Sequence, residues 1–361
     1  MKRILSIDGG GIRGVFSLEV LLQIEQLLRQ EYAKPDLVLA DHFDLFAGTS
    51  TGAIIATSLC WGMPVQEILD LYVNYGRTMF QPVPWYNFYK KLLVSRYEAK
   101  PLTLLLQRVF SEDGQGKVPA LLGTARLKKL LLVVIRNQST GSAWPLTNNP
   151  QALFSNPNNP DCNLNIPLWK VVRASTAAPV YFDPEEIVLG TQKHIFVDGS
   201  VTPYNNPAAI AALSAVLPCY RMGWPVGPEK LKLISIGSLR FTAGVPQNVK
   251  KLWIGYHAAN IPIALIQGIS WEQDLMCRCL GKCIFGEPLD VELGDLVGVN
   301  LPGERWFSYV RYNRSYRAQE LEALLRTDRK LAQLDAVKSI PLLREIGQVY
   351  AKENVRLEHV L

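Results

Sequence analysis

A serine between two glycines is the feature of this sequence with the clearest chemical potential. Gly48-Thr49-Ser50-Thr51-Gly52 follows a short apolar run at residues 43–47 and precedes a helix-forming stretch at residues 51–62. A G-x-S-x-G pattern at such a junction holds the serine hydroxyl on a sharp turn, where it projects into a cleft as a nucleophile. Gly48 and Gly52 are expected there because a side chain would clash across so tight a bend.

A glycine-rich loop near the N-terminus permits two different chemistries. Residues 8–14 read Asp-Gly-Gly-Gly-Ile-Arg-Gly and follow an apolar strand candidate at residues 3–7. Gly9-x-Gly11-x-x-Gly14 matches the fingerprint of a dinucleotide-binding module. That module also requires a second strand ending in an acidic residue about twenty positions later, and no such strand is visible here.

The other chemistry of this loop is oxyanion binding. Gly9, Gly10 and Gly11 leave backbone amides bare at the start of a helix, where negative charge is favoured. Such amides can hold the oxyanion that forms when a serine attacks an ester carbonyl. Arg13 would add positive charge or brace the loop. The presence of Ser50 downstream favours this interpretation.

A serine hydroxyl needs a proton acceptor to become a good nucleophile, and histidine is scarce in this chain. Among four histidines, His257 follows Asp198 in the Ser-Asp-His order of α/β-hydrolases, but its neighbours indicate the start of a helix and a structural role. Asp198 directly follows an apolar strand candidate, which places its carboxylate at a strand end, as for Ser50. Asp-Gly is also a common turn dipeptide. If Asp198 is the base, burial must raise its pKa from the reference value of ~3.9.

The remaining pattern predicts the elements that position these residues. Apolar strand candidates at 130–135, 195–197 and 231–236 alternate with helical spacing, as at 15–30 and 65–79. This alternation predicts an α/β fold with three α/β/α layers and a mostly parallel central sheet, plus C-terminal helices. We expect a catalytic domain over residues 1–300 and a helical extension over residues 301–361 packed on it. The Asn- and Pro-rich residues 137–167 are expected to form a long surface loop.

Composition and charge narrow the class of protein. The 361 residues are 48% hydrophobic and 19% charged, which suits a globular chain. The formal charge of +6 fits either an ordinary soluble surface or attraction to an anionic surface such as a phospholipid headgroup layer. No signal peptide and no apolar run of 18 residues is visible, so we expect a cytoplasmic protein with peripheral membrane contact. Cys277, Cys279 and Cys283 make an incomplete metal site, and no metal or other cofactor is expected.

One segment has the composition of a lipid-facing patch. Residues 81–100 combine aromatic rings with basic neighbours, a pattern typical of residues at a membrane interface. The alternative is a loop packed into the core. The candidate interfacial residues are Trp85, Tyr86, Phe88, Tyr89, Lys90 and Lys91.

Taken together, the motifs resemble those of the patatin-like phospholipases. Four segments occur in the order of that family: the glycine loop, the serine turn, a block at residues 173–182 and an Asp-Gly pair. They read DGGGIRG at 8–14, GTSTG at 48–52, RASTAAPVYF at 173–182 and DGS at 198–200, followed by NNP at 205–207. The family usually has Gly or Ala where Ser200 stands, and serine is small enough to keep the turn.

The resemblance implies a lipid acyl hydrolase. Its Ser–Asp dyad maps onto Ser50 and Asp198, uses no histidine or metal, and cleaves ester bonds of phospholipids or other glycerolipids through an acyl-enzyme. The family includes effectors that cyclic nucleotides activate in anti-phage defence, so a cyclic nucleotide activator is expected. No nucleic acid polymer is expected as a partner. The alternatives are a nucleotide-binding module built on Gly9-x-Gly11-x-x-Gly14 and an inactive patatin-like interaction protein.

Overall fold

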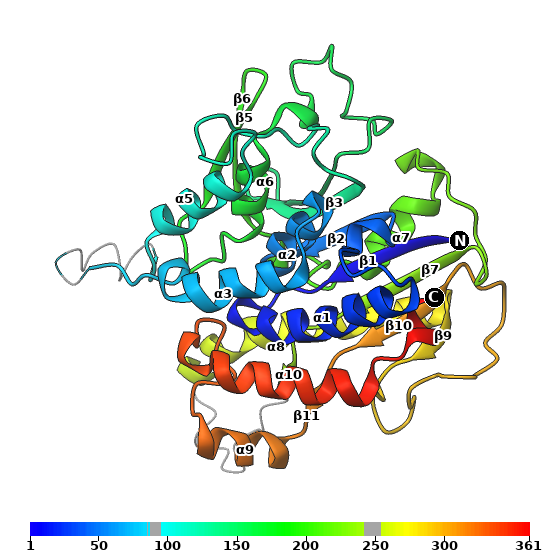
Figure 1. The fold of residues 1–361 in the computed structure, drawn as a ribbon. Coiled ribbons are helices and arrows are strands. Elements are labelled where there is room, and N and C mark those ends of the chain that lie inside the picture. The colour runs from blue at the N-terminus through cyan, green and yellow to red at the C-terminus, as the bar shows by residue number, and fades with distance from the viewer. Residues whose placement is uncertain (85, 87–94, 242–253) are drawn as a thin grey trace.

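The apolar segments form the strands of one mostly parallel sheet in the computed structural model (Figure 1). The structure describes residues 1–84, 86, 95–241 and 254–361. Eight strands of the nine-stranded sheet follow the order β5-β6-β3-β2-β1-β7-β10-β9, and β4 pairs with β3 outside this path. The strands are β1 (Lys2–Ile7), β2 (Leu45–Thr49), β3 (Leu130–Asn137), β4 (Ser142–Thr147), β5 (Glu185–Leu189), β6 (Gln192–Asp198), β7 (Leu231–Ile236), β9 (Lys282–Phe285) and β10 (Ser308–Tyr312). A separate pair joins β8 (Arg240–Phe241) to β11 (Ser315–Tyr316).

Side chains alternate between the two faces of the central strands, so each face carries its own apolar core. In β3, Val133 belongs to one core and Val134 to the other, and both are fully buried. The first core is covered by α1 (Gly14–Glu31), α2 (Thr51–Trp61), α3 (Val65–Met79), α5 (Ala99–Val109), α6 (Leu168–Ser175) and α10 (Ile340–Asn354). The second is covered by α7 (Ala208–Val216) and α8 (Ile254–Leu280). The predicted three-layer α/β fold is therefore confirmed.

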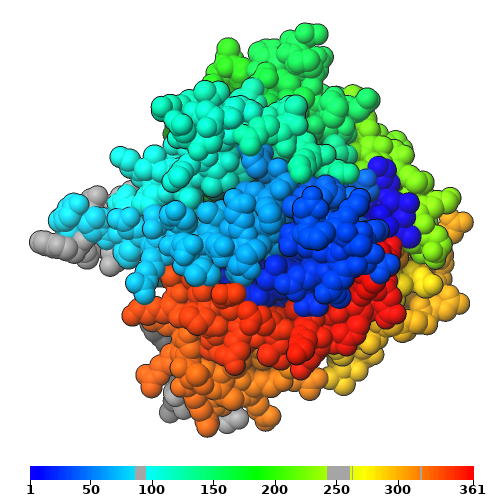
Figure 2. All heavy atoms as spheres, viewed as in Figure 1, coloured from blue at the N-terminus to red at the C-terminus, as the bar shows by residue number. Residues whose placement is uncertain are grey.

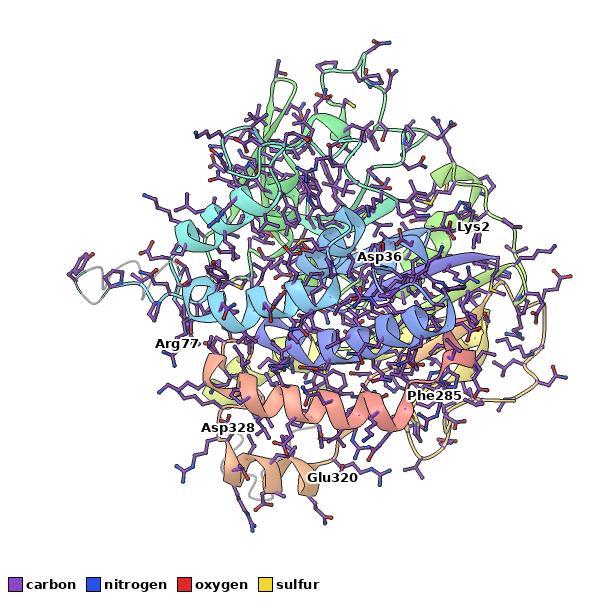
Figure 3. All side chains as sticks on the ribbon, in the orientation of Figure 1. Lys2, Asp36, Arg77, Phe285, Glu320 and Asp328 are labelled. Atoms are coloured by element: carbon purple, nitrogen blue, oxygen red, sulfur yellow. The ribbon has the colours of Figure 1, made fainter. Side chains whose placement is uncertain are left out.

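The C-terminal region is more than a helical extension. Residues 301–361 contain α9 (Ala318–Thr327), α10 and α11 (Leu357–Val360), but they also supply β10, which pairs in parallel with both β7 and β9. Figure 3 labels Glu320 in the first turn of α9, where its carboxylate accepts a hydrogen bond from the Arg317 amide. The sheet is thus completed by residues from the last fifth of the chain.

Two local expectations need correction. Residues 137–167 are not one loop, because β4 turns back on β3 as an antiparallel partner. Strand β6 runs antiparallel to β3, although the argument for Asp198 assumed a parallel strand. The two-residue connection at Gly190 and Thr191 makes β5 and β6 an antiparallel hairpin, and Gly190 has the positive φ of 57° that such a tight turn favours. The sheet is therefore antiparallel at the β5–β6–β3 end.

Helices from opposite ends of the chain pack together on the outer face. Figure 1 shows α10 alongside α1, and Figure 2 shows the two segments sharing one surface. The helices approach closely at Gly347, where an added Cβ would lie 2.8 Å from the Cβ of Glu19. Glu19 accepts a hydrogen bond from the Arg344 guanidinium at 2.6 Å, and the rings of Phe16 and Tyr350 lie 5.3 Å apart.

The described residues contain no helix that is both long and apolar enough to cross a bilayer. The three clustered cysteines are free thiols in different surroundings: Cys277 on α8 and Cys283 on β9 are buried, whereas Cys279 is exposed.

The packing of α10 gives a stability prediction. Leu343 is fully buried against the first core, so Leu343→Ala should lower the free energy of unfolding by about 2–5 kcal/mol because it leaves a cavity. Val349 on the same helix is 52% exposed, and Val349→Ala should change stability by less than about 0.5 kcal/mol. Urea denaturation followed by circular dichroism measures both. Equal stability of the two variants would show that α10 does not pack on the domain.

Candidate active site

Ser50 occupies the residue between β2 and α2, and its backbone is strained. Its φ is 56° and its ψ is −126°, a backbone conformation that residues other than glycine rarely adopt. The glycines on either side have a direct steric role. A Cβ on Gly48 would lie 2.2 Å from the Gly52 carbonyl oxygen, and one on Gly52 would lie 2.2 Å from that of Ile7. Only glycine fits where the strand, the turn and β1 come this close.

Neighbouring side chains hold the turn in this conformation. The Ser50 amide donates to the Ser175 hydroxyl at 2.9 Å, and that hydroxyl donates to the Val134 carbonyl at 2.7 Å. On the other side, the hydroxyls of Thr51 and Tyr72 lie 2.5 Å apart. Ser175 belongs to the block at 173–182, but no local pattern indicates its contact with the turn. This buried hydroxyl fixes the turn to β3.

Asp198 meets Ser50 because two strands end head-on along β3. Thr49 pairs with Val134, and Asp198 pairs with the next residue, Ile135. The C-terminal ends of β2 and β6 therefore abut, and the Ser50 hydroxyl donates to Asp198 Oδ2 at 2.7 Å. The structure brings together the two residues that the sequence singled out, although β6 arrives from the opposite direction to that expected.

The surroundings of Asp198 change its acidity. The side chain is fully buried, and this burial raises the pKa of the carboxyl from 3.8 to about 6. Hydrogen bonds oppose the rise: Oδ1 accepts from the Ser200 amide at 2.7 Å, and Oδ2 accepts from Ser50. The guanidinium of Arg173, also buried, lowers the pKa to a lesser extent. The carboxylate is therefore a stronger base than an exposed aspartate and is still mostly ionised at neutral pH.

The glycine loop lies beside the serine. A Cβ on Gly9 would lie 3.2 Å from the Ser50 Cβ, so absence of a side chain lets the loop approach. The Gly9 amide donates to the backbone carbonyl of Asn205 at 3.0 Å. This amide is therefore already bonded and is not free to serve as an oxyanion donor, contrary to expectation. Within the described ranges, the amides of Gly10 and Gly11 have no hydrogen-bond partner. Arg13 Nε donates to the Gly10 carbonyl at 3.2 Å and so braces the loop.

A buried ion pair anchors the start of this loop. Arg311 on β10 makes two hydrogen bonds to the carboxylate of Asp8, at 2.8 and 2.6 Å, and a third to the Ser235 hydroxyl. Burial alone would lower the pKa of Arg311, but the adjacent carboxylate raises it above its ordinary value, so the guanidinium stays charged. Sequence reasoning missed Arg311, because nothing local connects residue 311 to the N-terminal loop.

Most of the predicted interfacial residues cannot be placed relative to this site. Trp85, Phe88, Tyr89, Lys90 and Lys91 lie outside the described residues, and so does the side chain of His257. Tyr86 is described and is 75% exposed.

Comparison with known proteins finds a matching family and several relatives of this chain. A family model described as Patatin-like phospholipase matches residues 5–212, which include the glycine loop, Ser50 and Asp198. A cGAMP-activated phospholipase of Escherichia coli (strain TW11681) is 28% identical over 260 residues, covering 70% of this chain and 67% of the relative. A second protein of that name from Vibrio cholerae is 29% identical, covering 66% and 64%. Patatin-17 of Solanum cardiophyllum is 28% identical, covering 66% and 60%. The chain thus spans about two thirds of these relatives, or slightly less.

The raised pKa of Asp198 gives a stability prediction with a definite sign. Between its unfolded pKa of 3.8 and its folded pKa of about 6, the folded state binds the proton more tightly, so stability falls as pH rises through this window. Well above pH 6, ionisation of Asp198 lowers the free energy of unfolding by about 3 kcal/mol. Below pH 4 the carboxyl is protonated in both states, and this loss disappears. Asp198→Asn should therefore raise the free energy of unfolding more at pH 8 than at pH 4. Urea denaturation at both values measures this; an equal effect at the two values would contradict the burial argument.

Proposed function

The chain belongs to the patatin-like phospholipase family, and we propose that it is a lipid acyl hydrolase whose nucleophile is Ser50 and whose general base is Asp198. The observation that carries the proposal is the 2.7 Å hydrogen bond from the Ser50 hydroxyl to Asp198 at a strained turn. The substrate class is a phospholipid or other glycerolipid ester, as the family description suggests. The same hydrogen bond favours this proposal over the alternative that the chain is a catalytically inactive patatin-like interaction protein.

The reaction follows from the positions of these groups. Ser50 Oγ attacks the ester carbonyl carbon while Asp198 takes the hydroxyl proton. The carbonyl oxygen becomes an oxyanion, and the amides of Gly10 and Gly11 donate hydrogen bonds to it. The carbon–oxygen bond to the alcohol then breaks, and the alcohol leaves with the proton from Asp198. Water repeats the sequence on the acyl-enzyme, which releases the fatty acid and restores Ser50.

The glycine loop fits this role better than dinucleotide binding. Its first amide, that of Gly9, is bonded to Asn205, and the loop lies against the Ser50 turn.

Regulation by a cyclic nucleotide is part of the proposal. Two relatives, each about 28–29% identical, are named cGAMP-activated phospholipases. We infer that a cyclic dinucleotide activates this chain as well, with membrane breakdown in antiviral defence as its use. Its place of action would be the cytoplasmic surface of a membrane, with peripheral contact.

Replacement of either reacting residue tests the mechanism. Ser50→Ala and Asp198→Ala should each lower fatty acid release about 10³-fold or more, because neither partner activates the reaction alone. Free fatty acids are read by mass spectrometry from a phospholipid and galactolipid panel, with and without cGAMP. His257→Ala serves as the matched control and should retain activity. Activity retained in Asp198→Ala but lost in His257→Ala would replace the proposed base.

Contact with the lipid surface is tested separately. The aromatic segment at residues 85–91 should insert its rings at the headgroup level, so a Trp85→Ala, Phe88→Ala double variant should bind anionic liposomes several-fold more weakly. Co-sedimentation measures the bound fraction. Tyr75→Ala, which removes a 39% exposed ring from α3, is the control. Unchanged binding of the double variant would remove this segment from the interface.

A further inference from the structure

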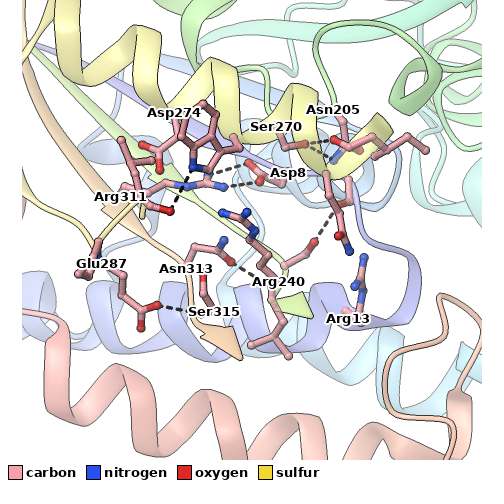
Figure 4. Close-up of a pocket in the computed structure, with 18 of the residues that line it drawn as sticks. Asp8, Arg13, Asn205, Arg240, Ser270, Asp274, Glu287, Arg311, Asn313 and Ser315 are labelled. Carbon is pink, nitrogen blue, oxygen red and sulfur yellow. Dashed lines mark hydrogen bonds and ion pairs between the residues drawn. The ribbon is translucent and has the colours of Figure 1, made fainter. Parts of the chain in front are cut away.

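A polar pocket lies directly behind the catalytic loop and is separate from Ser50. Figure 4 shows it between α8 on one side and the segments that follow β1, β7 and β10 on the other. Its wall shares residues with the active site, since Asp8, Gly9 and Arg13 line it. Neither Ser50 nor Asp198 does, so the mechanism above assigns the pocket no task.

The pocket holds more positive than negative charge. Four arginines and three carboxylates line it, and two pairs cancel: Arg311 with Asp8 at 2.6 Å and Arg278 with Asp274 at 2.9 Å. The third carboxylate, that of Glu287, lies 3.4 Å from Arg314 and accepts from the Ser315 amide at 2.8 Å. Arg13 and Arg240 are left without an acidic partner among the described residues.

Among the described arginines that line the pocket, Arg240 is the one whose side chain makes no hydrogen bond. It extends from β8 into the pocket, as Figure 4 shows, and its side chain makes no hydrogen bond within the part of the chain described here. Arg13, by contrast, donates to the Gly10 carbonyl. Burial lowers the pKa of Arg240, and the nearby charge of Arg311 lowers it further, whereas Asp274 opposes both. The nitrogens of this guanidinium are not among the buried polar atoms that lack a partner, so its donors are open to the pocket and are available to an anion.

We propose that Arg240 binds the phosphodiester group of a ligand in this pocket and that occupancy acts on the catalytic loop. A phosphodiester carries one negative charge on two non-bridging oxygens, which match the paired donors of a guanidinium. The proposal rests on the function proposed above, because both of its ligands, the phospholipid headgroup and the cyclic dinucleotide, contain this group. Trp271 supplies an aromatic surface beside it, fixed by its Nε1 donating to the Leu289 carbonyl at 3.2 Å.

The pocket wall is bonded directly to the loop that carries the oxyanion amides. The Ser238 hydroxyl, two residues before Arg240, donates to the Gly9 carbonyl at 2.7 Å. Asn205, whose carbonyl accepts from the Gly9 amide, donates through Nδ2 to the Ser270 hydroxyl of α8 at 3.0 Å. A ligand that displaces Arg240 or α8 therefore displaces Ser238 or Asn205, both of which are hydrogen-bonded to Gly9. Gly9 directly precedes Gly10 and Gly11, whose amides are free.

Binding is tested in the full chain with Ser50→Ala, so that the measured heat reports binding without hydrolysis of any lipid that copurifies with the protein. Isothermal titration with cGAMP should give an affinity that Arg240→Gln weakens about 10-fold or more, as expected for loss of a charge-assisted hydrogen bond. Arg326→Gln is the matched control, since Arg326 is 78% exposed on α9. Arg240→Lys keeps the charge but loses the paired donors, and it carries the test if Arg240→Gln fails to fold.

A second arm identifies the source of the phosphodiester. Hydrolysis of soluble dihexanoylphosphatidylglycerol is compared with that of the neutral ester p-nitrophenyl butyrate, in chains with Ser50 intact. If the headgroup occupies the pocket, Arg240→Gln lowers the ratio of kcat/KM for phospholipid to that for neutral ester about 10-fold. Loss in the cGAMP arm alone assigns the pocket to the activator, and loss in the phospholipid arm alone assigns it to the substrate.

No loss in either arm, with the variant folded, overturns the proposal. Failure of the enzyme function is distinguishable: a wild-type chain that binds cGAMP through Arg240 but hydrolyses neither ester rejects the hydrolase and retains the pocket.

Discussion

The site depends on one constraint, the head-on meeting of β2 and β6 along β3. Because Thr49 and Asp198 pair with consecutive residues of β3, the backbone ladder sets the separation of Ser50 and Asp198. Short side chains can then meet at 2.7 Å with little freedom to separate. The same arrangement buries the carboxylate, which raises its pKa to about 6. The position of the carboxylate and its raised pKa thus have one structural origin. In the proposed mechanism, this arrangement replaces the histidine that other serine hydrolases use as the base.

The glycine loop depends on parts of the chain far from it in sequence. The family model ends at residue 212, yet three supports of the loop come later. Ser238 donates to the Gly9 carbonyl, Arg311 binds the carboxylate of Asp8, and the Leu334 carbonyl accepts from the Ile12 amide. These residues follow β7, lie in β10 and precede α10. The part of the chain after residue 212 therefore supports the glycine loop as well as the sheet, and the matched segment alone would lack these three contacts.

Much of this architecture could be predicted from sequence where the signal is local. The Ser50 turn was visible because strand, turn and helix are adjacent, and the run at residues 130–135 marked a strand buried on both faces. The direction of β6 could not be predicted, since a short apolar strand looks the same in either direction. Strand β10 was missed because Arg311 interrupts its apolar pattern, and its burial makes sense only beside Asp8. The bonding of the Gly9 amide likewise depends on Asn205, a contact that no local pattern encodes.

The positive φ of Ser50 has a consequence for how the molecule fails. An L-residue held in this region stores about 1–3 kcal/mol, which the surrounding contacts must offset. Ser175 and Tyr72 supply such contacts from α6 and α3, both outside the strand that carries the serine. If the first turn of α2 loosens, the serine relaxes to an ordinary conformation while the sheet beneath it stays intact. Inactivation by heat or denaturant should then begin with a local change in the backbone at Ser50, before the protein unfolds globally.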